Sequence, residues 1–251
     1  MTTAPVPGDS AQAVGKPRPA PPEKPRRAEL ATMIDHTLLR PEVTGEEIVA
    51  LCKEARDLGV GAVCVAPTHV YLAAACAREH GLAEQPAYTV AAVVGFPFGT
   101  HLTTVKAEEA RLAVNDGANE LDIVIDLACA IDENWRSVEA EIAAIRLAVP
   151  PHVVLKVILE TAALTETAIV AGCRAAEAAG AEFVKTSTGF HPAGGASLRA
   201  VELMHDTVGG RIGIKASGGI RTAEAALAFV AAGATRIGAS ASAAILADVP
   251  A

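Results

Sequence analysis

Short apolar stretches of strand length recur along the chain and alternate with longer stretches that have a helical period. The apolar stretches predict eight strands, at residues 33–35, 62–66, 89–95, 120–125, 153–159, 182–186, 212–215 and 235–238. Between them, apolar residues recur at the spacing of an amphipathic helix. One helix is predicted to begin after Thr44, which forms a capping box with Glu47. Strands that alternate with helices are typical of an α/β protein with a parallel sheet.

Glycines mark the predicted joints between helices and strands. They stand where helices are expected to end, at positions 59, 81, 117, 180 and 233. Most lead directly into the next strand, as in DGANELDIV and AGAEFVKT, with a period of roughly thirty residues, the size of a βα unit. Two architectures fit this pattern, a closed barrel and an open doubly wound sheet. An open sheet would be expected to carry G-x-G-x-x-G after its first strand, and that motif is missing there. We therefore predict a single (β/α)8 TIM barrel.

The first 28 residues differ from the rest in composition. They are rich in proline, alanine and charged residues, as in KPRPAPPEKPRR. Such a segment cannot bury enough apolar surface to offset the entropy lost on ordering. We predict a disordered N-terminal extension over residues 1–28 and a barrel domain over residues 29–251.

Composition and charge narrow the class of protein. Hydrophobic residues make up 51% of the chain and aromatic residues only 3%, which predicts an aliphatic core. The net charge of -8 argues against nucleic-acid binding but permits one small anionic ligand. The five cysteines are scattered, which favours free thiols in a reducing cytoplasm. We find neither an apolar stretch long enough to cross a membrane nor a signal peptide, so we expect a cytoplasmic protein with no membrane contact.

Charged and polar residues gather at the predicted strand ends, which form the active-site face of a barrel. They are Asp35, Thr37, Cys64, Asp122, Asp126, Lys156, Glu160, Lys185 and Lys215. A buried lysine costs several kcal/mol unless it is paired or neutral. When it is neutral, its amine can attack a carbonyl to form a Schiff base. A structural ion-pair network is the alternative interpretation, but the convergence of so many charges on one face favours chemistry. On this pattern Lys185 and Lys215 are equal candidates for the nucleophile.

Strand alternation assigns faces to the fourth strand. Leu121, Ile123 and Ile125 share one face, whereas Asp122 and Asp126 share the other, which points into the barrel. A carboxylate in the lumen can move a proton or hold a lysine in place. Asp126 lies at the strand end, and its alternative role is to cap the following loop. We expect Cys64 to be buried and inert, although it lies on the strand-two segment of the site.

The last two strands end in loops of glycines and hydroxyl residues. These are Ser217-Gly218-Gly219-Ile220-Arg221-Thr222 and Gly238-Ala239-Ser240. The loops after the final two strands are where TIM barrels commonly bind phosphate, through backbone N–H groups and helix N-termini. The sequence therefore predicts a phosphate site here.

Four histidines, His36, His69, His101 and His191, lie in or after the predicted strands. A metal site requires several ligands to converge, and their spacing does not indicate that. We interpret each of them as a loop or surface residue. We predict no metal and no cofactor.

Segments at all eight strand ends, in order, match one family. They are IDHTLL, AVCVAP, VVGFPFGTH, GANELDIVID, LKVILET, FVKTSTGFHPAGGAS, IKASGGIRT and RIGAS. On these segments residues 30–246 resemble the deoxyribose-phosphate aldolases, class I Schiff-base aldolases of deoxynucleoside catabolism. The resemblance implies reversible cleavage of 2-deoxy-D-ribose 5-phosphate to acetaldehyde and D-glyceraldehyde 3-phosphate, without a metal.

The resemblance also implies roles for individual residues. Lys185 would form the Schiff base, Lys215 would keep Lys185 deprotonated, and Asp122 would relay protons. Substrate or phosphate contacts are predicted at Asp35, Thr37, Cys64, Lys156, Thr186, Gly189, Gly218, Gly219, Arg221, Gly238 and Ser240.

Three positions depart from the pattern of some members of the family. Phe190 stands where some carry a lysine, and Ala241 stands where some carry a second serine. Some members end in a flexible tail with a tyrosine that assists proton transfer, whereas this sequence ends in DVPA. We expect these differences to affect rate and phosphate affinity and not the class of reaction.

Two alternatives to this function are a Schiff-base aldolase for another phosphosugar and a non-catalytic phosphosugar-binding barrel. A pure binding protein would not need a neutral buried amine, so Lys185, Lys215 and Asp122 together argue against the second alternative. The expected partner is a small phosphosugar. The alanine-rich helices also suggest packing into a homodimer or a higher homo-oligomer.

Overall fold

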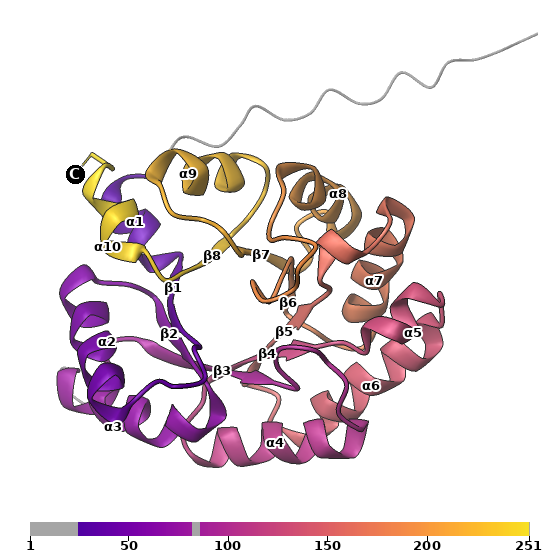
Figure 1. The fold of residues 1–251 in the computed structure, drawn as a ribbon, viewed down its shortest axis with the longest axis horizontal. Coiled ribbons are helices and arrows are strands. Elements are labelled where there is room, and N and C mark those ends of the chain that lie inside the picture. The colour runs from indigo at the N-terminus through magenta and orange to yellow at the C-terminus, as the bar shows by residue number, and fades with distance from the viewer. Residues whose placement is uncertain (1–24, 82–85, 251) are drawn as a thin grey trace, which may run out of the picture.

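The computed structural model describes residues 25–81 and 86–250. Its strands form one closed parallel barrel, in which each strand pairs with the next and β8 pairs with β1 (Figure 1). The strands are β1 (Ile34–Leu38), β2 (Ala62–Val65), β3 (Thr89–Val94), β4 (Glu120–Val124), β5 (Val154–Ile158), β6 (Phe183–Lys185), β7 (Gly213–Ser217) and β8 (Arg236–Ala239). The prediction of a closed barrel over an open sheet is confirmed. The first strand was predicted too short, since it continues to Leu38.

Helices surround the barrel as an outer ring (Figure 1). The longer ones are α2 (Gly45–Leu58), α3 (Val70–His80), α4 (Thr103–Asn115), α6 (Trp135–Ala148), α7 (Glu166–Ala178), α8 (Leu198–Val208) and α9 (Ala223–Ala231). The shorter ones are α1 (Arg27–Thr32), α5 (Leu127–Ile131), α10 (Ser242–Ala247) and the 3-10 turns η1 (Pro67–His69) and η2 (Thr161–Ala163). No helix in these described ranges is long and apolar enough to cross a membrane.

The helix ends described here follow the predicted signals. The Thr44 hydroxyl accepts a hydrogen bond from the Glu47 amide, and the Glu47 carboxylate accepts one from the Thr44 amide, so the capping box is confirmed. Gly59 ends α2 in the left-handed conformation that glycine favours. Gly81 also follows the last residue of its helix, α3, but its backbone is extended, with φ -76° and ψ 172°.

The core lies in two layers on either side of the barrel wall. Leu121, Ile123 and Ile125 are fully buried among the helices, on the face opposite Asp122, as the alternation predicts. A small second cluster inside the barrel contains Cys64, Ala91 and Val93, with Leu39 and Phe96 packed against it. The lumen is therefore apolar on the side of β2 and β3. Its charged residues lie elsewhere.

Most of the predicted extension, residues 1–24, lies outside the described residues. The described part begins with α1, which starts at Arg27, so the predicted boundary at residue 28 is too late. The Arg27 amide donates to the Pro250 carbonyl at 3.0 Å, and Leu30 is fully buried. The barrel domain thus includes α1, which lies against the C-terminal segment.

Candidate active site

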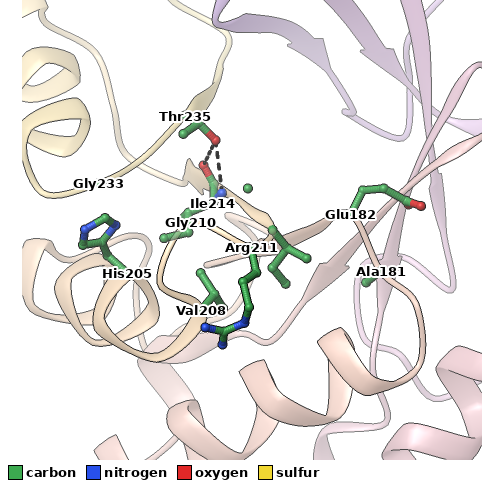
Figure 2. Close-up of a pocket in the computed structure, with 11 residues that line it drawn as sticks. Ala181, Glu182, His205, Val208, Gly210, Arg211, Ile214, Gly233 and Thr235 are labelled. Carbon is green, nitrogen blue, oxygen red and sulfur yellow. Dashed lines mark hydrogen bonds between the residues drawn. The ribbon is translucent and has the colours of Figure 1, made fainter. Parts of the chain in front are cut away.

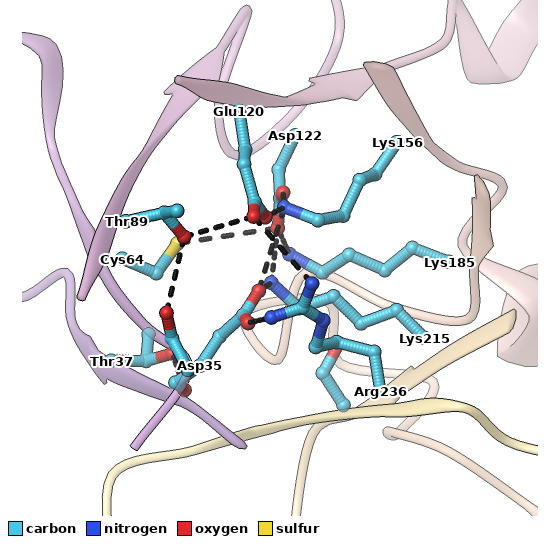
Figure 3. A network of polar contacts seen from close by, with 12 residues as sticks. Asp35, Thr37, Cys64, Thr89, Glu120, Asp122, Lys156, Lys185, Lys215 and Arg236 are labelled. Atoms are coloured by element: carbon cyan, nitrogen blue, oxygen red, sulfur yellow. Dashed lines mark hydrogen bonds and ion pairs between the residues drawn. The ribbon is translucent and has the colours of Figure 1, made fainter. Parts of the chain in front are cut away.

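A network of buried charges fills the lumen, with Asp122 at its centre (Figure 3). Lys156 Nζ donates to Asp122 Oδ1 at 2.8 Å. Lys185 Nζ and Lys215 Nζ each donate to Asp122 Oδ2 at 2.6 Å. The barrel register explains the convergence, because Asp122 lies beside Lys156 on β4 and β5, and Lys185 lies beside Lys215 on β6 and β7. One carboxylate therefore connects three lysines.

A second set of charges anchors this network. Asp35 pairs with Lys215, lies 3.5 Å from Lys156 and accepts from Arg236 at 3.0 Å. Glu120 contacts Lys156 at 2.5 Å and Arg236 at 3.5 Å. Burial alone would lower the pKa of Lys156, but these carboxylates raise it above its ordinary value. Lys156 is therefore a fixed cation that holds the network together.

Charge balance distinguishes Lys185 from the other lysines. Besides Lys185, the network holds three cations and three carboxylates: Lys156, Lys215, Arg236, Asp35, Glu120 and Asp122. These charges cancel, so an added proton on Lys185 would leave an uncompensated positive charge in the lumen. Burying such a charge is costly, which favours the neutral amine at Lys185.

The pKa directions of the two lysines agree with this balance. Burial lowers the pKa of Lys185, and the charge of Lys215 lowers it further, against the opposing effect of Asp122. Burial would also lower the pKa of Lys215, but Asp122 and Asp35 together raise it above its ordinary value. The free amine is thus favoured at Lys185, and the charged ammonium is favoured at Lys215.

A cavity of about 370 Å³ lies above the network, with Lys185 and Lys215 in its lining. Predicted residues line much of it: Thr37, Lys185, Gly189, Lys215, Gly218, Gly219, Arg221, Gly238 and Ser240. Gly218 and Gly219 have φ values of +96° and +85°, which other residues rarely adopt. A Cβ on Gly218 would lie 2.9 Å from Gly195 Cα, so glycine is needed there for packing as well.

The remaining predicted residues do not line the cavity. Asp35, Asp122, Lys156 and Cys64 are fully buried in the lumen. Cys64 Sγ lies 4.0 Å from Asp122 Oδ2, and burial raises the pKa of this thiol, which keeps it protonated and unreactive.

Thr186, another predicted substrate contact, is also absent from the cavity lining. Its hydroxyl donates to the Ser217 carbonyl and accepts from the Ser217 amide, both at 3.1 Å. The hydroxyl therefore joins the ends of β6 and β7. Strand position alone did not reveal this partner.

The cavity wall also contains residues for which the sequence predicted no role, among them Leu39, Arg40 and Thr188. Leu39 and Thr188 lie within the segments IDHTLL and FVKTSTGFHPAGGAS, so the family resemblance was a signal for both. Arg40 carries no comparable signal, because it follows the end of the first of these segments.

Two further polar residues have structural roles. Asp126 caps α5, where its carboxylate accepts from the Ala128 amide at 3.0 Å, as the alternative interpretation held. His36 was interpreted as a loop or surface residue, and this is wrong. It is buried on β1, with Nδ1 2.8 Å from Ser242 Oγ. In the described ranges, no group of three His, Cys, Asp or Glu residues is placed to hold a metal ion.

A second cavity, of about 330 Å³, opens at the amino ends of β6, β7 and β8 (Figure 2). Glu182, His205 and Arg211 line it, but Arg211 is already paired with Glu177. Barrel enzymes carry their active sites at the opposite, carboxyl face of the strands. The cavity above Lys185 is therefore the candidate active site.

We expect the Asp35 carboxylate to make the free energy of unfolding depend on pH in the acidic range. Burial would raise its pKa, but Lys215, Lys156 and Arg236 lower it to about 2. Because the folded pKa lies below the unfolded one, the stabilisation is present above about pH 4 and is lost as the pH falls to about 2. This contribution to the free energy of unfolding is about 2 kcal/mol. Urea unfolding between pH 2 and 5 should show a shallower pH dependence for Asp35→Asn than for the wild type. Parallel curves for the two proteins would contradict the assignment.

The closed barrel and the charged cavity at its carboxyl face define a TIM-barrel enzyme. The chain belongs to the DeoC/LacD family of aldolases, whose family model matches residues 30–247. It is therefore a lyase of the aldolase class, and the resemblance found in the sequence is confirmed.

Relatives and solved structures agree with this family. The deoxyribose-phosphate aldolase of Frankia alni is 68% identical over 226 residues, which cover 90% of this chain and 100% of that protein. The deoxyribose-phosphate aldolase of Nocardia farcinica is 57% identical, with 90% and 97% covered. A crystal structure of a putative deoxyribose-phosphate aldolase from Coccidioides immitis has a TM-score of 0.84 and 41% identity, covering 90% of this chain and 87% of that one. The deoxyribose phosphate aldolase of Aeropyrum pernix, described as a unique tetramer, has a TM-score of 0.80 and 33% identity, with 88% and 91% covered.

Proposed function

We propose that this protein is a class I aldolase that reversibly cleaves 2-deoxy-D-ribose 5-phosphate to acetaldehyde and D-glyceraldehyde 3-phosphate. The observation that carries the proposal is Lys185, a buried lysine with a lowered pKa in the lining of a cavity. Its Nζ shares the Asp122 carboxylate with the ammonium of Lys215. The names of the relatives support the choice of substrate.

The reaction begins with attack of Lys185 Nζ on the C1 aldehyde of the open-chain sugar. Loss of water gives a protonated imine, which is the electron sink. A base then removes the proton of the C3 hydroxyl, the C2–C3 bond breaks, and its electron pair moves into the imine to form an enamine. Protonation of the enamine at C2 and addition of water release acetaldehyde and return the amine.

Asp122 and Lys215 are placed to handle the protons of these steps. Asp122 Oδ2 lies 2.6 Å from both amine nitrogens, so it connects the reacting amine to Lys215. Lys215 lines the cavity, and its raised pKa keeps it charged. A charged donor beside the reacting centre can supply the proton at C2 directly or through one water.

The phosphate is proposed to bind at the loops after β7 and β8. Gly218, Gly219 and Gly238 allow close approach to the backbone, and Arg221 and Ser240 add side-chain donors. These loops lie on the same side of the cavity as Lys215. A substrate with its aldehyde at Lys185 would reach them with its other end.

Trapping the imine tests the proposal. The protein is incubated with acetaldehyde and borohydride, digested, and searched by mass spectrometry for a two-carbon adduct. We expect the adduct on the peptide that carries Lys185, and unmodified Lys215 and Lys156 serve as internal controls. An adduct confined to another lysine, or no adduct at all, would overturn the assignment.

Replacing Arg221 should weaken phosphate binding selectively. Arg221 lines the cavity and is exposed, so its loss leaves no buried group unpaired. We expect Arg221→Ala to raise KM for 2-deoxy-D-ribose 5-phosphate by about tenfold, the worth of a hydrogen bond to a charged group. The kcat/KM for 2-deoxy-D-ribose, which lacks the phosphate, should stay near the wild-type value. Equal losses with both sugars would assign Arg221 a role other than phosphate binding.

We also propose a cytoplasmic location, a role in deoxyribonucleoside catabolism and a homo-oligomeric state. All five cysteines are free, as expected in a reducing compartment. The net charge of -8 does not favour nucleic acid as a partner. The tetramer described for the Aeropyrum pernix protein supports self-association.

A further inference from the structure

A layer of side chains lies in the lumen below the reacting amine, towards the amino ends of the strands. It consists of Glu120 on β4, Phe183 on β6 and Arg236 on β8, and we call it the amino-end layer. Alternate residues of a strand face the same side, so Phe183 shares the luminal face with Lys185. Glu120 shares it with Asp122 in the same way. No member of the layer belongs to the lining of the active-site cavity, so the layer is not placed to touch a bound substrate.

Arg236 is held in this layer by its neighbours. Its guanidinium carbon lies over the Phe183 ring, 5.8 Å from the ring centroid. Two glycines leave room for these side chains. A Cβ on Gly213 would lie 2.2 Å from the Phe183 ring, and a Cβ on Gly61 would lie 3.1 Å from Arg236 Nη1. Since only 17% of the Arg236 side chain is exposed, its guanidinium is fixed within the lumen.

A chain of ion pairs joins Arg236 to the reacting amine (Figure 3). Arg236 Nη1 donates to Asp35 Oδ1 at 3.0 Å, and the other oxygen of Asp35 accepts from Lys215 Nζ. Lys215 Nζ also donates to Asp122 Oδ2 at 2.6 Å. That same oxygen accepts from Lys185 Nζ at 2.6 Å. Asp35 therefore has one oxygen bound to the amino-end layer, which leaves the other directed at Lys215.

The charge of Arg236 completes the balance of the buried network. Titratable side chains reach the lumen from every strand except β3, which carries none: Asp35 (β1), Cys64 (β2), Glu120 and Asp122 (β4), Lys156 (β5), Lys185 (β6), Lys215 (β7) and Arg236 (β8). Cys64 stays neutral, because burial raises its pKa. Without Arg236, three carboxylates would face only two fixed cations. A proton on Lys185 would restore the balance, so removal of Arg236 favours the ammonium form of the nucleophile.

We propose that Arg236 is a positioning residue of the aldolase reaction, which acts through Asp35 to keep Lys215 charged and Lys185 a free amine. The inference rests on the proposed function, in which Lys185 forms the imine. Arg236 holds the Asp35 carboxylate towards Lys215 and supplies the third cation of the network. An arginine does not lose its proton in a protein, so this charge is constant over the pH range in which the amine titrates.

The pH profile of kcat/KM for 2-deoxy-D-ribose 5-phosphate tests this role in Arg236→Gln, because its acidic limb reports the protonation of groups in the free enzyme. With the cation gone, Lys185 binds a proton more readily. The acidic limb should move up by about one pH unit, a tenfold change in proton affinity. At neutral pH kcat/KM should fall by up to about tenfold, and the deficit should shrink as the pH rises. A loss of the same size at every pH would overturn the proposal, since Arg236 would then only support the fold.

Two further variants separate charge from packing. Arg236→Lys keeps a cation in the layer and should hold the limb near its wild-type position, which covers the case of an unstable glutamine variant. Arg146→Gln is the matched control, because the Arg146 side chain is 15% exposed but pairs with Glu182 from the outer helix α6. Its limb should stay in place. A limb that moves as far in Arg236→Lys as in Arg236→Gln would contradict a role for the charge.

Trapping of the wild-type protein with acetaldehyde and borohydride distinguishes this proposal from the proposed function. No adduct on Lys185 would refute the proposed function. An adduct on Lys185 together with an unmoved limb in Arg236→Gln would refute the role of Arg236 alone.

Discussion

Lys185→Leu is expected to abolish aldol cleavage while the barrel stays folded. The substitution removes the amine that forms the imine. The other lysine in the cavity lining, Lys215, is not expected to replace it, because Asp122 and Asp35 raise its pKa and keep it charged. We expect kcat/KM for 2-deoxy-D-ribose 5-phosphate to fall by about 10⁴-fold or more, as for loss of other catalytic nucleophiles. The fold should tolerate the change, because Asp122 keeps Lys156 and Lys215 as partners.

The measurement is release of D-glyceraldehyde 3-phosphate in a coupled assay, together with thermal unfolding followed by circular dichroism. Lys53→Leu provides a matched control, since Lys53 is an exposed lysine on the outer helix α2. It should retain wild-type turnover. Wild-type turnover in Lys185→Leu would show that Lys185 is not the nucleophile.

Lys215→Met is expected to have the second-largest effect, and to change the pH dependence as well as the rate. With Lys215 gone, three carboxylates face only Lys156 and Arg236, so the network draws a proton onto Lys185. The charge of Lys215 also lowers the pKa of Lys185 directly, and that effect disappears. Both changes raise the pKa of Lys185 and reduce its free-amine form at neutral pH.

We therefore expect kcat/KM of Lys215→Met to fall by about 10²- to 10⁴-fold at neutral pH, the usual contribution of a general acid or base. The acidic limb of its pH profile should move to higher pH. Lys106→Met controls for lost stability, because Lys106 is an equally buried lysine, paired with Glu141 at 2.6 Å between α4 and α6. Its acidic limb should stay in place. A limb that stays in place or moves to lower pH in Lys215→Met would contradict the role given to Lys215.

Local pattern accounts for much of what the sequence predicted. The period-two alternation of β4 separates Leu121 from Asp122, and the structure places them on opposite sides of the barrel wall. The order of strands, the closed barrel and the glycine loops after β7 and β8 follow from spacing and turn chemistry. These features depend on neighbours along the chain, so a sequence is sufficient to find them.

What the sequence did not reveal concerns side chains whose partners are distant in the chain. Nothing in the sequence indicated that the Thr186 hydroxyl bonds to Ser217 on the next strand. His36 was expected at a surface, but it lies buried against Ser242. The aromatic contact between Phe96 and Phe190 also joins loops that are widely separated in the chain. Residue type alone does not say which of two distant segments a side chain will meet.

The sequence by itself determined that two lysines end apolar strands beside a buried aspartate, in a barrel with a phosphate-type loop. The family resemblance implied that Lys185 is the nucleophile, but the physical reason to prefer it over Lys215, the balance of buried charges, appears only in the tertiary structure. Their pKa values depend on burial and on charges a few ångströms away, and Asp35, which holds Lys215 in its charged form, is 180 residues distant in the chain. Such distances through space exist only once the barrel has closed, because closure brings β1 beside β8 and places β7 within reach of Asp35.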